Sequence, residues 1–384
     1  MRILYFSKDY TPHDHRFLTA LAGTEHQVFY LRLERRGHAR EDRSLPAQVE
    51  QITWAGGQTL ARRGDGLRLL VDLKRVLRTV KPDLVHAGPL QTTAFLAALS
   101  GFRPLVSMSW GYDLLVDAQR DALWRWATRF TLKRSTVMIG DCNAIRELAM
   151  TYGMPEERIV TFPWGVDLRK FSPGDGLERQ KIWPSYGEPE NNTGVFVLLC
   201  NRSWEPIYGV DVIAKAFVLA SQMLTGMNYP ELRLLMLGHG SQAGALREIF
   251  SLGGFLDRVH FPGHVSQTDL PRYYRSSDLY LSASHSDGSS VSLLEAIACG
   301  LPGLVSDIPG NREWITPGVQ GWWFPDGDYR AMAEAIVRAV EQRGRLAEMG
   351  RAARLLAEQR ADWEINFAQL LKAYDMAVSV KKRN

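Results

Sequence analysis

The sequence predicts an α/β protein made of two doubly wound, Rossmann-like domains. Three observations lead to this fold class. Strand-like apolar runs alternate with helix-period segments along the first half of the chain, a polar stretch rich in proline and glycine follows from 172 to 194, and the alternation then restarts. Such alternation is typical of a parallel sheet with helices on both faces. A chain of 384 residues is long enough for two cores of this kind.

The first domain is expected at residues 1–175, because short apolar runs recur there with room for one helix between each pair. The expected strands are 2–7, 27–33, 83–87, 104–110, 136–140 and 158–162. The expected helices are 13–21, 66–80, 90–99, 117–133 and 142–152. Parallel strands joined by helices place their carboxyl ends along one edge of the sheet, where ligands bind in such folds.

A linker is predicted at 176–194, and a second domain at 195–360. Its expected strands are 195–201, 232–237, 258–261, 279–283 and 303–306. Two helical runs, 329–341 and 344–359, are followed by a break at 360–362 and a last helix at 363–378. Two doubly wound domains joined by a linker lead us to expect the ligand in the cleft between them.

Composition and charge exclude several classes of protein. With 45% hydrophobic and 23% charged residues, the chain has the composition of a soluble globular protein. Its three cysteines are odd in number and far apart, so neither a disulfide framework nor a zinc site is indicated and a reducing compartment is expected. A strand starts directly after Met1, and no apolar run is long enough to span a bilayer. We therefore expect a cytoplasmic protein.

The net charge of +4 is unevenly distributed. Residues 1–175 carry 25 Lys and Arg against 19 Asp and Glu, a balance of +6, which leaves −2 for the rest. A basic first half favours an anionic acceptor or peripheral contact with the inner face of a membrane. An ordinary solvated surface is the simpler interpretation of so small an excess, and it is the one we favour.

The segment 287–302 contains the strongest functional signal. Apolar residues recur at helical spacing, with Ser289 or Ser290 suited to the N-cap and Gly300 suited to the end, so a helix is predicted at about 290–299. Glu295 is the only charged residue of this helix, and a carboxylate among apolar side chains is costly unless it accepts strong hydrogen bonds. The hydroxyls of a ribose would supply them. Pairing with an arginine is the alternative interpretation.

The amides of Ser290, Val291 and Ser292 are expected at the positive end of this helix, where a diphosphate is stabilised. Asp287 lies in the turn between the preceding strand and this helix, and it would face the group that the diphosphate carries. Together with Glu295, this arrangement describes a nucleotide-sugar pocket.

The pattern Asp287-x7-Glu295 followed by Ala-x-Ala-x-Gly-x-Pro resembles the E-x7-E segment of the family-4 retaining glycosyltransferases of GT-B fold, with Asp in place of the first Glu. The resemblance is strongest over 136–173 and 201–315. It implies two domains facing across a cleft, an acceptor-binding first domain that the last helix (about 361–384) rejoins, and a nucleotide-sugar-binding second domain. The activity it implies is retaining transfer of a hexosyl unit from a nucleotide diphosphate sugar to an acceptor hydroxyl, without an essential metal.

The resemblance also assigns donor-binding residues in the second domain. Arg202, at the end of an apolar strand, is similar to the family's phosphate-binding arginine, whose planar fork suits phosphate oxygens. Tyr208 stands where a lysine is usual, which removes one positive charge, and Arg312 is our first candidate to compensate. Gly238 resembles a glycine turn near the base and ribose. The backbone at His264 and Val265 resembles the segment that reads the base edge, so the base stays undetermined.

In the first domain, family members often have a histidine where this chain has Trp110. The role of positioning the transferred sugar then passes to Asp113, to His86 or to no residue. A lone histidine after a strand is more often a structural hydrogen-bonding residue, and that interpretation of His86 is favoured.

No metal or other cofactor is expected. Asp326-Gly327-Asp328 has the D-x-D form of metal-dependent transferases, but it precedes a helix, where Asp328 is a natural N-cap. The expected partners are therefore a nucleotide-sugar donor and a hydroxyl acceptor, with no nucleic acid. A donor-binding protein without transferase activity, or a GT-B phosphorylase or epimerase, is the alternative.

The segment 122–134 is aromatic and basic. Docking on a membrane surface is one interpretation. Packing of Leu123, Trp126 and Phe130 on the sheet is the other, and it is favoured here because these residues fall on one helical stripe.

Overall fold

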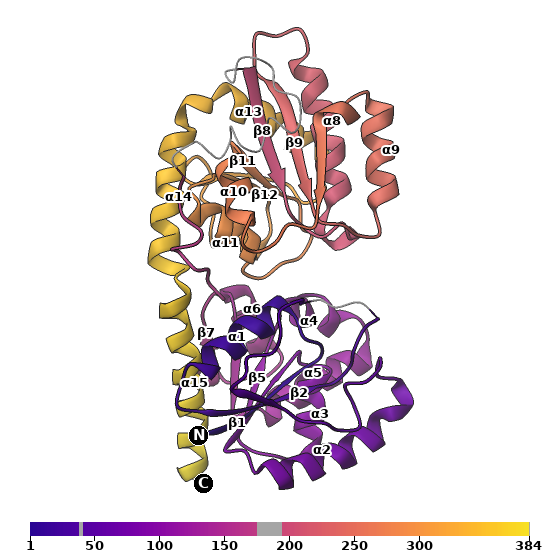
Figure 1. Cartoon of the computed structure of the whole chain (residues 1–384), viewed down its shortest axis with the longest axis vertical. Helices are drawn as coiled ribbons and strands as arrows, with labels where there is room; N and C mark the ends of the chain where they lie inside the picture. Colours follow the sequence, from indigo (N-terminus) through magenta and orange to yellow (C-terminus); the bar gives the residue numbers. More distant parts are fainter. Residues whose placement is uncertain (38–40, 175–193, 384) are drawn as a thin grey trace. The chain divides into compact units, whose positions relative to one another are not determined.

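The computed structural model describes residues 1–37, 41–174 and 194–383 (Figure 1). They form two compact units, Met1–Phe162 with Phe367–Asn384, and Pro163–Asn366. The predicted linker at 176–194 lies, apart from Gly194, outside the described residues. The part of the chain that is described contains no helix with the length and apolar character needed to cross a bilayer.

The first unit contains a seven-stranded parallel sheet in the order β3-β2-β1-β4-β5-β6-β7. The strands are β1 (Arg2–Ser7), β2 (Gln27–Arg32), β3 (Val49–Gln51), β4 (Leu84–Gly88), β5 (Leu105–Met108), β6 (Val137–Gly140) and β7 (Ile159–Thr161). The helices are α1 (Pro12–Ala22), α2 (Gly66–Val80), α3 (Thr93–Ser100), α4 (Tyr112–Leu115), α5 (Ala122–Arg134) and α6 (Asn143–Thr151). Strand order reverses between β1 and β4, as in doubly wound folds.

The second unit contains a six-stranded parallel sheet in the order β10-β9-β8-β11-β12-β13. The strands are β8 (Val195–Cys200), β9 (Glu231–Leu237), β10 (Val259–Gly263), β11 (Leu279–Ser282), β12 (Gly303–Ser306) and β13 (Gly321–Phe324). The helices are α8 (Val210–Leu224), α9 (Ala243–Gly253), α10 (Leu270–Arg275), α11 (Val291–Ala298), α12 (Pro309–Arg312), α13 (Tyr329–Glu341) and α14 (Leu346–Arg360). Here the order reverses between β8 and β11, so the loops that follow these two strands meet at the switch point.

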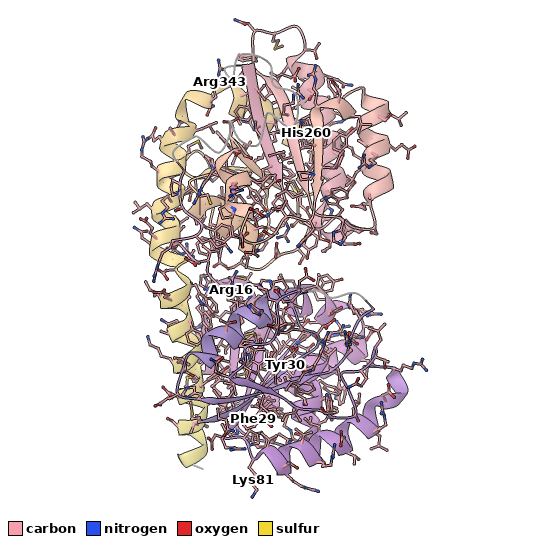
Figure 2. All side chains as sticks on the ribbon, in the orientation of Figure 1. Arg16, Phe29, Tyr30, Lys81, His260 and Arg343 are labelled. Carbon is pink, nitrogen blue, oxygen red and sulfur yellow. The ribbon has the colours of Figure 1, made fainter. Side chains whose placement is uncertain are left out.

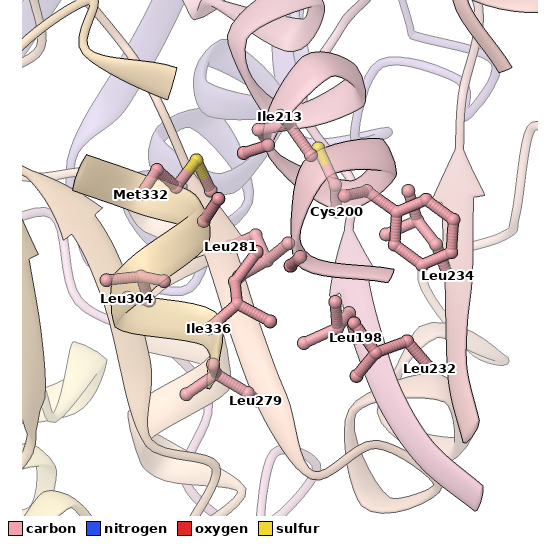
Figure 3. Close-up of a cluster of buried hydrophobic side chains, with 14 of the residues drawn as sticks. Leu198, Cys200, Ile213, Leu232, Leu234, Leu279, Leu281, Leu304, Met332 and Ile336 are labelled. Atoms are coloured by element: carbon pink, nitrogen blue, oxygen red, sulfur yellow. The ribbon is translucent and has the colours of Figure 1, made fainter. Parts of the chain in front are cut away.

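Apolar side chains cover both faces of the second sheet, because successive residues of a strand point to opposite faces. Leu198 of β8 packs in one cluster with Ile213 of α8 and Ile336 of α13, as Figure 3 shows. Its neighbours Val197 and Leu199 belong to the other cluster, with the apolar residues of α11. Helix α11 is thereby fixed against the sheet beside the switch point.

Side chains also fill the first unit. Figure 2 labels Tyr30, whose buried hydroxyl lies 3.0 Å from Oγ of Ser7. Lys81, labelled in the same view, follows α2 in the left-handed conformation with φ of 48°, and its amide donates to the carbonyl of Leu77. Helix α2 ends at Val80, as the sequence predicted.

The last helix, α15 (Trp363–Arg383), contributes residues from Phe367 onward to the first unit. Tyr374 is buried there, with its hydroxyl 2.6 Å from Nδ1 of His86. The expected return of the terminal helix to the first domain is confirmed.

Three predictions made from the sequence were wrong. The edge strands β3 and β13 were missed; β3 has only three residues, too few to show periodicity, whereas β13 went unrecognised although it is as long as β12. Helix α5 begins at Ala122 instead of 117, since a 3₁₀ turn precedes it and Asp121 caps it by accepting from the amide of Trp124 at 2.9 Å.

The outward face of α5 is the third correction. Phe130 is half-buried against the core, but Leu123 and Trp126 are 67% and 51% exposed. The residues of α5 that the structure buries are small or closer to its end, namely Ala127, Thr128, Thr131 and Leu132. Two of the three residues expected to pack on the sheet therefore face outward.

Candidate functional site

Helix α11 begins at the switch point of the second unit, one residue later than predicted, and ends at Ala298. Ser290 occupies the N-cap position, but its side chain does not cap the helix. Its Oγ instead accepts a hydrogen bond of 2.8 Å from Nη1 of Arg202. The first turn therefore has no side-chain cap from Ser290, and its backbone N–H groups carry the positive end of the helix dipole.

Arg202 lies just beyond β8 and brings the predicted phosphate-site residues together. Nη1 donates to Ser290 and, at 2.9 Å, to Ser292, while Nη2 donates to Oδ2 of Asp287 at 2.6 Å. The ring of Tyr208 lies against the guanidinium, 4.2 Å from its carbon. The Arg202 and Asp287 side chains are 11% and 20% exposed. The pair is thus partly shielded from water, where charge-assisted hydrogen bonds are strong.

The charge of Arg202 is secure. Burial, the largest single influence, lowers its pKa, but the carboxylate of Asp287 together with Tyr280, Tyr208 and Cys200 outweighs burial, so the net pKa is raised. The guanidinium is therefore a permanent cation at the start of α11, paired with the carboxylate of Asp287.

Glu295 is almost fully buried within α11. Its Oε2 accepts a hydrogen bond of 2.8 Å from the hydroxyl of Tyr274, which in turn accepts one of 2.7 Å from Nδ2 of Asn201. Tyr280 donates to Oγ of Ser292 at 2.8 Å. Sequence reasoning did not single out Asn201, Tyr274 or Tyr280. The sequence around each of these residues gives no sign of its role, because its hydrogen-bonding partners are distant in the sequence.

Two glycines allow close backbone approach around this site. Gly209 follows Tyr208 with φ of 57°, and a Cβ there would collide with the carbonyl oxygen of Ala283 at the end of β11. A Cβ on Gly310, in α12, would collide with the carbonyl oxygen of Gly288. Side chains at these positions would push the β8 and β12 loops away from the segment that carries Asp287.

The remaining predicted donor residues lie on neighbouring loops of the second unit. Gly238 follows β9 with φ of 91°, and its amide donates to the carbonyl of Gly263 at 2.7 Å. His264 is exposed directly after β10, and Val265 packs against the core cluster that includes α11. Gly238 lies beside the Arg202 loop, since a Cβ at Gly238 would be 3.7 Å from the carbonyl oxygen of Arg202. The part of these residues in donor binding stays a prediction.

Arg312 already has an acidic partner. Its guanidinium pairs with Asp307 through bonds of 2.6 and 2.9 Å and lies over the ring of Trp323. The pairing lowers the pKa of Asp307, chiefly through the hydrogen bond from Arg312. The positive charge that Tyr208 fails to supply is therefore not replaced by an unpaired Arg312.

The first-unit candidates are engaged in local networks. Asp113 is buried, and its carboxylate accepts from the hydroxyl of Ser109 at 2.6 Å and from the amides of Leu90, Trp110 and Leu114. Burial raises the pKa of Asp113 to about 6, although these hydrogen bonds act to lower it. Burial likewise lowers the pKa of His86 to about 3. These contacts favour structural roles for both residues.

The described ranges, which omit 38–40 and 175–193, contain no group of three or more His, Cys, Asp or Glu side chains placed to hold a metal ion. Asp328 caps α13 by accepting from the amides of Arg330 and Ala331. Asp326 pairs instead with Nδ1 of His285 at 2.7 Å. The N-cap interpretation of the D-x-D segment agrees with these contacts.

Two family models match the chain, one on each half. Residues 13–170 match the model described as Glycosyltransferase Family 4, and residues 186–356 match the model described as Glycosyl transferases group 1. The chain belongs to the family-4 glycosyltransferases. The resemblance drawn from Asp287-x7-Glu295 is thereby confirmed.

Curated members of this family are similar over part of the chain. A D-inositol 3-phosphate glycosyltransferase of Gordonia bronchialis is 30% identical over 237 residues, 60% of this chain and 50% of that protein. A GDP-mannose-dependent monoacylated alpha-(1-6)-phosphatidylinositol monomannoside mannosyltransferase of Corynebacterium glutamicum is 23% identical over 300 residues, 73% of this chain and 72% of that protein. The chain spans about half the length of the first curated relatives it matches.

Solved structures share the fold. Anabaena Alr3699/HepE in complex with UDP has a TM-score of 0.77 at 17% identity, covering 98% of this chain and 100% of that one. Sucrose-phosphate synthase from Thermosynechococcus elongatus has a TM-score of 0.78 at 18% identity, covering 99% and 100%. The predicted GT-B fold of two parallel-sheet domains is confirmed.

Proposed function

We propose that this family member is a retaining hexosyltransferase that moves a sugar from a nucleotide diphosphate sugar to an acceptor hydroxyl. The observation that carries the proposal is the cluster at the start of α11, where Arg202, Asp287 and Ser292 are hydrogen-bonded around the free end of the helix. Glu295 follows on the same helix, buried and held by a phenol. Asp287, Arg202 and Glu295 would therefore face the sugar, the diphosphate and the ribose of a donor, in that order.

Each group has one task in this proposal. Arg202 and the first amides of α11 stabilise the charge that develops on the departing diphosphate. Asp287 accepts from hydroxyls of the transferred sugar, and Glu295 accepts from the ribose. The bond between the anomeric carbon and the phosphate oxygen breaks while the acceptor oxygen bonds to the same face of that carbon. The acceptor proton passes to the departing phosphate oxygen, so configuration is retained without a protein nucleophile.

The ion pair between Arg202 and Asp287 is part of this mechanism. The diphosphate needs the guanidinium that Asp287 now occupies, and Asp287 needs a new hydrogen-bonding partner once it is displaced. Sugar hydroxyls next to the diphosphate provide that partner. A complete donor therefore satisfies both side chains, whereas a free nucleoside diphosphate satisfies only Arg202.

We further propose that the diphosphate is stabilised without a metal ion. A permanently charged arginine and the amides of a helix N-terminus supply the electrostatic stabilisation that a cation would supply. Turnover that is unchanged by EDTA, and not restored or raised by added Mn²⁺ or Mg²⁺, is the expected result. Strict dependence on a divalent ion would overturn this part.

One observation favours a second function, donor binding without transfer. Tyr208 replaces the usual lysine, and among the residues that the structure describes, Arg202 is the only cation paired with Asp287 and the serines of the cluster. The two functions are distinguished by incubating the protein with UDP-, GDP- and ADP-sugars and measuring both the thermal shift and the nucleotide released. A stabilised protein that releases no nucleotide, with or without acceptors, would favour the binding protein.

A contact of the first unit with a membrane surface is a separate part of the proposal. Helix α5 carries four basic residues, Arg125, Arg129, Lys133 and Arg134, and no acidic one. Exposed Trp126 stacks on Phe130 at 5.5 Å between ring centroids and meets Phe95 edge-on at 5.6 Å. An exposed aromatic and basic face suits the headgroup region of an anionic bilayer, where Trp and Arg partition favourably.

Vesicle sedimentation tests this contact. Vesicles of phosphatidylcholine with phosphatidylglycerol should retain the protein, and vesicles of phosphatidylcholine alone should retain less. The double variant Leu123→Ser, Trp126→Ser should lose most of the binding, while Leu252→Ser, at a leucine of α9 that is even more exposed than Leu123, should not. Equal loss with both variants, or no retention of the unmodified protein, would overturn the proposed surface.

A further inference from the structure

Tyr274 links the two ends of the proposed donor site. Its ring comes from α10 and is 1% exposed. Its hydroxyl donates to Oε2 of Glu295 at 2.8 Å and accepts from Nδ2 of Asn201, the residue directly before Arg202, at 2.7 Å. The ring also packs edge-on against Phe171 and meets Tyr280 at 6.2 Å. A single buried phenol therefore bridges the loop that carries Arg202 and the helix that carries Glu295.

The hydroxyl of Tyr274 donates its hydrogen to one particular acceptor. A phenol has one hydrogen to donate, and two acceptors lie within reach, the carboxylate of Glu295 at 2.8 Å and the carbonyl of Ser292 at 3.1 Å. The bond to an ionised carboxylate is shorter and stronger. Burial, followed by the charge of Glu295, raises the pKa of Tyr274, so the phenol keeps its proton at physiological pH. Oε2 is thus held by a permanent donor from the protein.

A glutamate side chain has three rotatable bonds, and a helix fixes only its starting point. Holding one carboxylate oxygen removes most of the remaining freedom before a ligand arrives, which lowers the entropic cost of binding. Asn201 orients the phenol from the opposite side, so the hydroxyl itself is held at a fixed angle. The carboxylate of Glu295 is in this way preorganised by two residues that are not expected to touch the donor.

We infer that Tyr274 is a positioning residue for Glu295 and thereby sets the protein's preference for a nucleotide with free ribose hydroxyls. This inference rests on the proposed function, in which Glu295 holds the ribose. Tyr274→Phe removes the hydroxyl and keeps the ring that packs on Phe171. It should weaken the recognition of the ribose hydroxyls and leave the recognition of the diphosphate intact.

The test compares each nucleoside diphosphate with its 2′,3′-dideoxy analogue by calorimetry, using the uridine, guanosine and adenosine pairs. For the base that binds, the unmodified protein should prefer the ribose form by about tenfold or more, which corresponds to roughly 1.4 kcal/mol. Tyr274→Phe should reduce that preference by about 3- to 10-fold without changing the affinity for the dideoxy analogue. Asn201→Ala should reduce it by a smaller factor, since the phenol remains.

Two matched variants define the comparison. Glu295→Gln should abolish most of the preference. Tyr280→Phe should keep it, because Tyr280 is an equally buried tyrosine whose hydroxyl bonds Ser292 and not Glu295. A Tyr274→Phe protein that loses affinity for both nucleotides by the same factor has a structural defect only, and that result overturns the inference. Full retention of the preference overturns it as well.

Failure of the proposed function looks different from failure of the inference. If no nucleoside diphosphate binds the unmodified protein, the donor site itself is wrong. If the two analogues bind equally well, Glu295 does not hold the ribose and Tyr274 has nothing to position. The role of Tyr274 alone is contradicted by one result. In that result, Glu295→Gln removes the ribose preference and Tyr274→Phe leaves it unchanged.

Discussion

Nη2 of Arg202 lies 2.6 Å from Oδ2 of Asp287, so the two residues proposed to contact different parts of the donor also contact each other. The pair is held between the ring of Tyr208 on one side and the serines of α11 on the other. Binding of a donor diphosphate requires the guanidinium to exchange one anionic partner for another. The first two predictions follow from this exchange.

Asp287→Asn should bind a free nucleoside diphosphate more tightly, by about 3- to 10-fold, because Arg202 loses its competing carboxylate. Turnover of the complete donor should fall, since the sugar hydroxyls lose a strong acceptor. Calorimetry with the nucleoside diphosphate measures the first effect and nucleotide release the second. Asp307→Asn is the matched control and should change neither, because Asp307 pairs with Arg312 and not with Arg202. Weaker binding by Asp287→Asn would contradict the exchange.

Arg202→Ala should lower kcat by about 100-fold or more, as is found when a group that stabilises charge in the transition state is removed. The effect on KM should be smaller, because the helix amides still bind the diphosphate in the ground state. Steady-state kinetics separate the two parameters. Arg312→Ala removes an exposed, paired arginine and should leave both unchanged. Equal changes in kcat and kcat/KM with Arg312→Ala would instead place that residue at the leaving group.

His86→Gln should make the protein less sensitive to acid. Burial lowers the pKa of folded His86 to about 3, whereas an unfolded histidine titrates near 6.5, so the unfolded state binds more protons between these values. Stability from this residue is therefore fully present above about pH 6.5 and is lost as the pH falls. The loss should reach about 3 kcal/mol near pH 4, given 1.36 kcal/mol per pKa unit.

Denaturant unfolding of the protein and of His86→Gln at neutral pH and near pH 4 measures this effect. The difference in the free energy of unfolding between the two proteins should shrink, or change sign, at the lower pH. Tyr374→Phe, which removes the hydroxyl that bonds Nδ1 but keeps the buried imidazole, should retain the acid sensitivity. An unchanged difference at both values would mean that His86 does not titrate on unfolding.

Gly209→Ala should destabilise the second unit by about 1–3 kcal/mol, because its φ of 57° is costly for alanine and its Cβ collides with the carbonyl oxygen of Ala283. The shifted loop would also move Tyr208 and weaken donor binding. Gly244→Ala is the control, since Gly244 lies in α9 with open space around it and alanine should stabilise a helix there by about 0.5–1 kcal/mol. Thermal unfolding of both variants checks the opposite signs.

The sequence allowed much of the fold to be predicted, because long apolar or periodic segments report burial directly. The bounds of β1, β12, α2 and α13 agree with the structure residue for residue. Strand β3 was missed because it has only three residues, and β13 was missed although it is as long as β12. The face of α5 was misjudged because periodicity shows which residues share a stripe but not whether a neighbour covers it.

The site was predictable where chemistry follows directly from position in the chain. Arg202 ends a buried strand and Ser290 opens a helix, so topology alone brings them to one edge of the sheet. Tyr274 was not predictable, since it sits in a six-residue helix and bonds a carboxylate 21 residues away through tertiary packing. The pairing of Arg202 with Asp287 was also missed, because the two residues are 85 positions apart and neither carries a local sign of the other.

Helix α15 has a consequence for how the protein is made. The first unit is complete only when Tyr374 has packed beside His86, yet the whole second unit is translated between these two residues. On the ribosome, the sheet of the first unit must therefore wait, with the surface around His86 uncovered, until the segment from Phe367 emerges. A chaperone that shields this surface until then is expected to raise the yield of native protein.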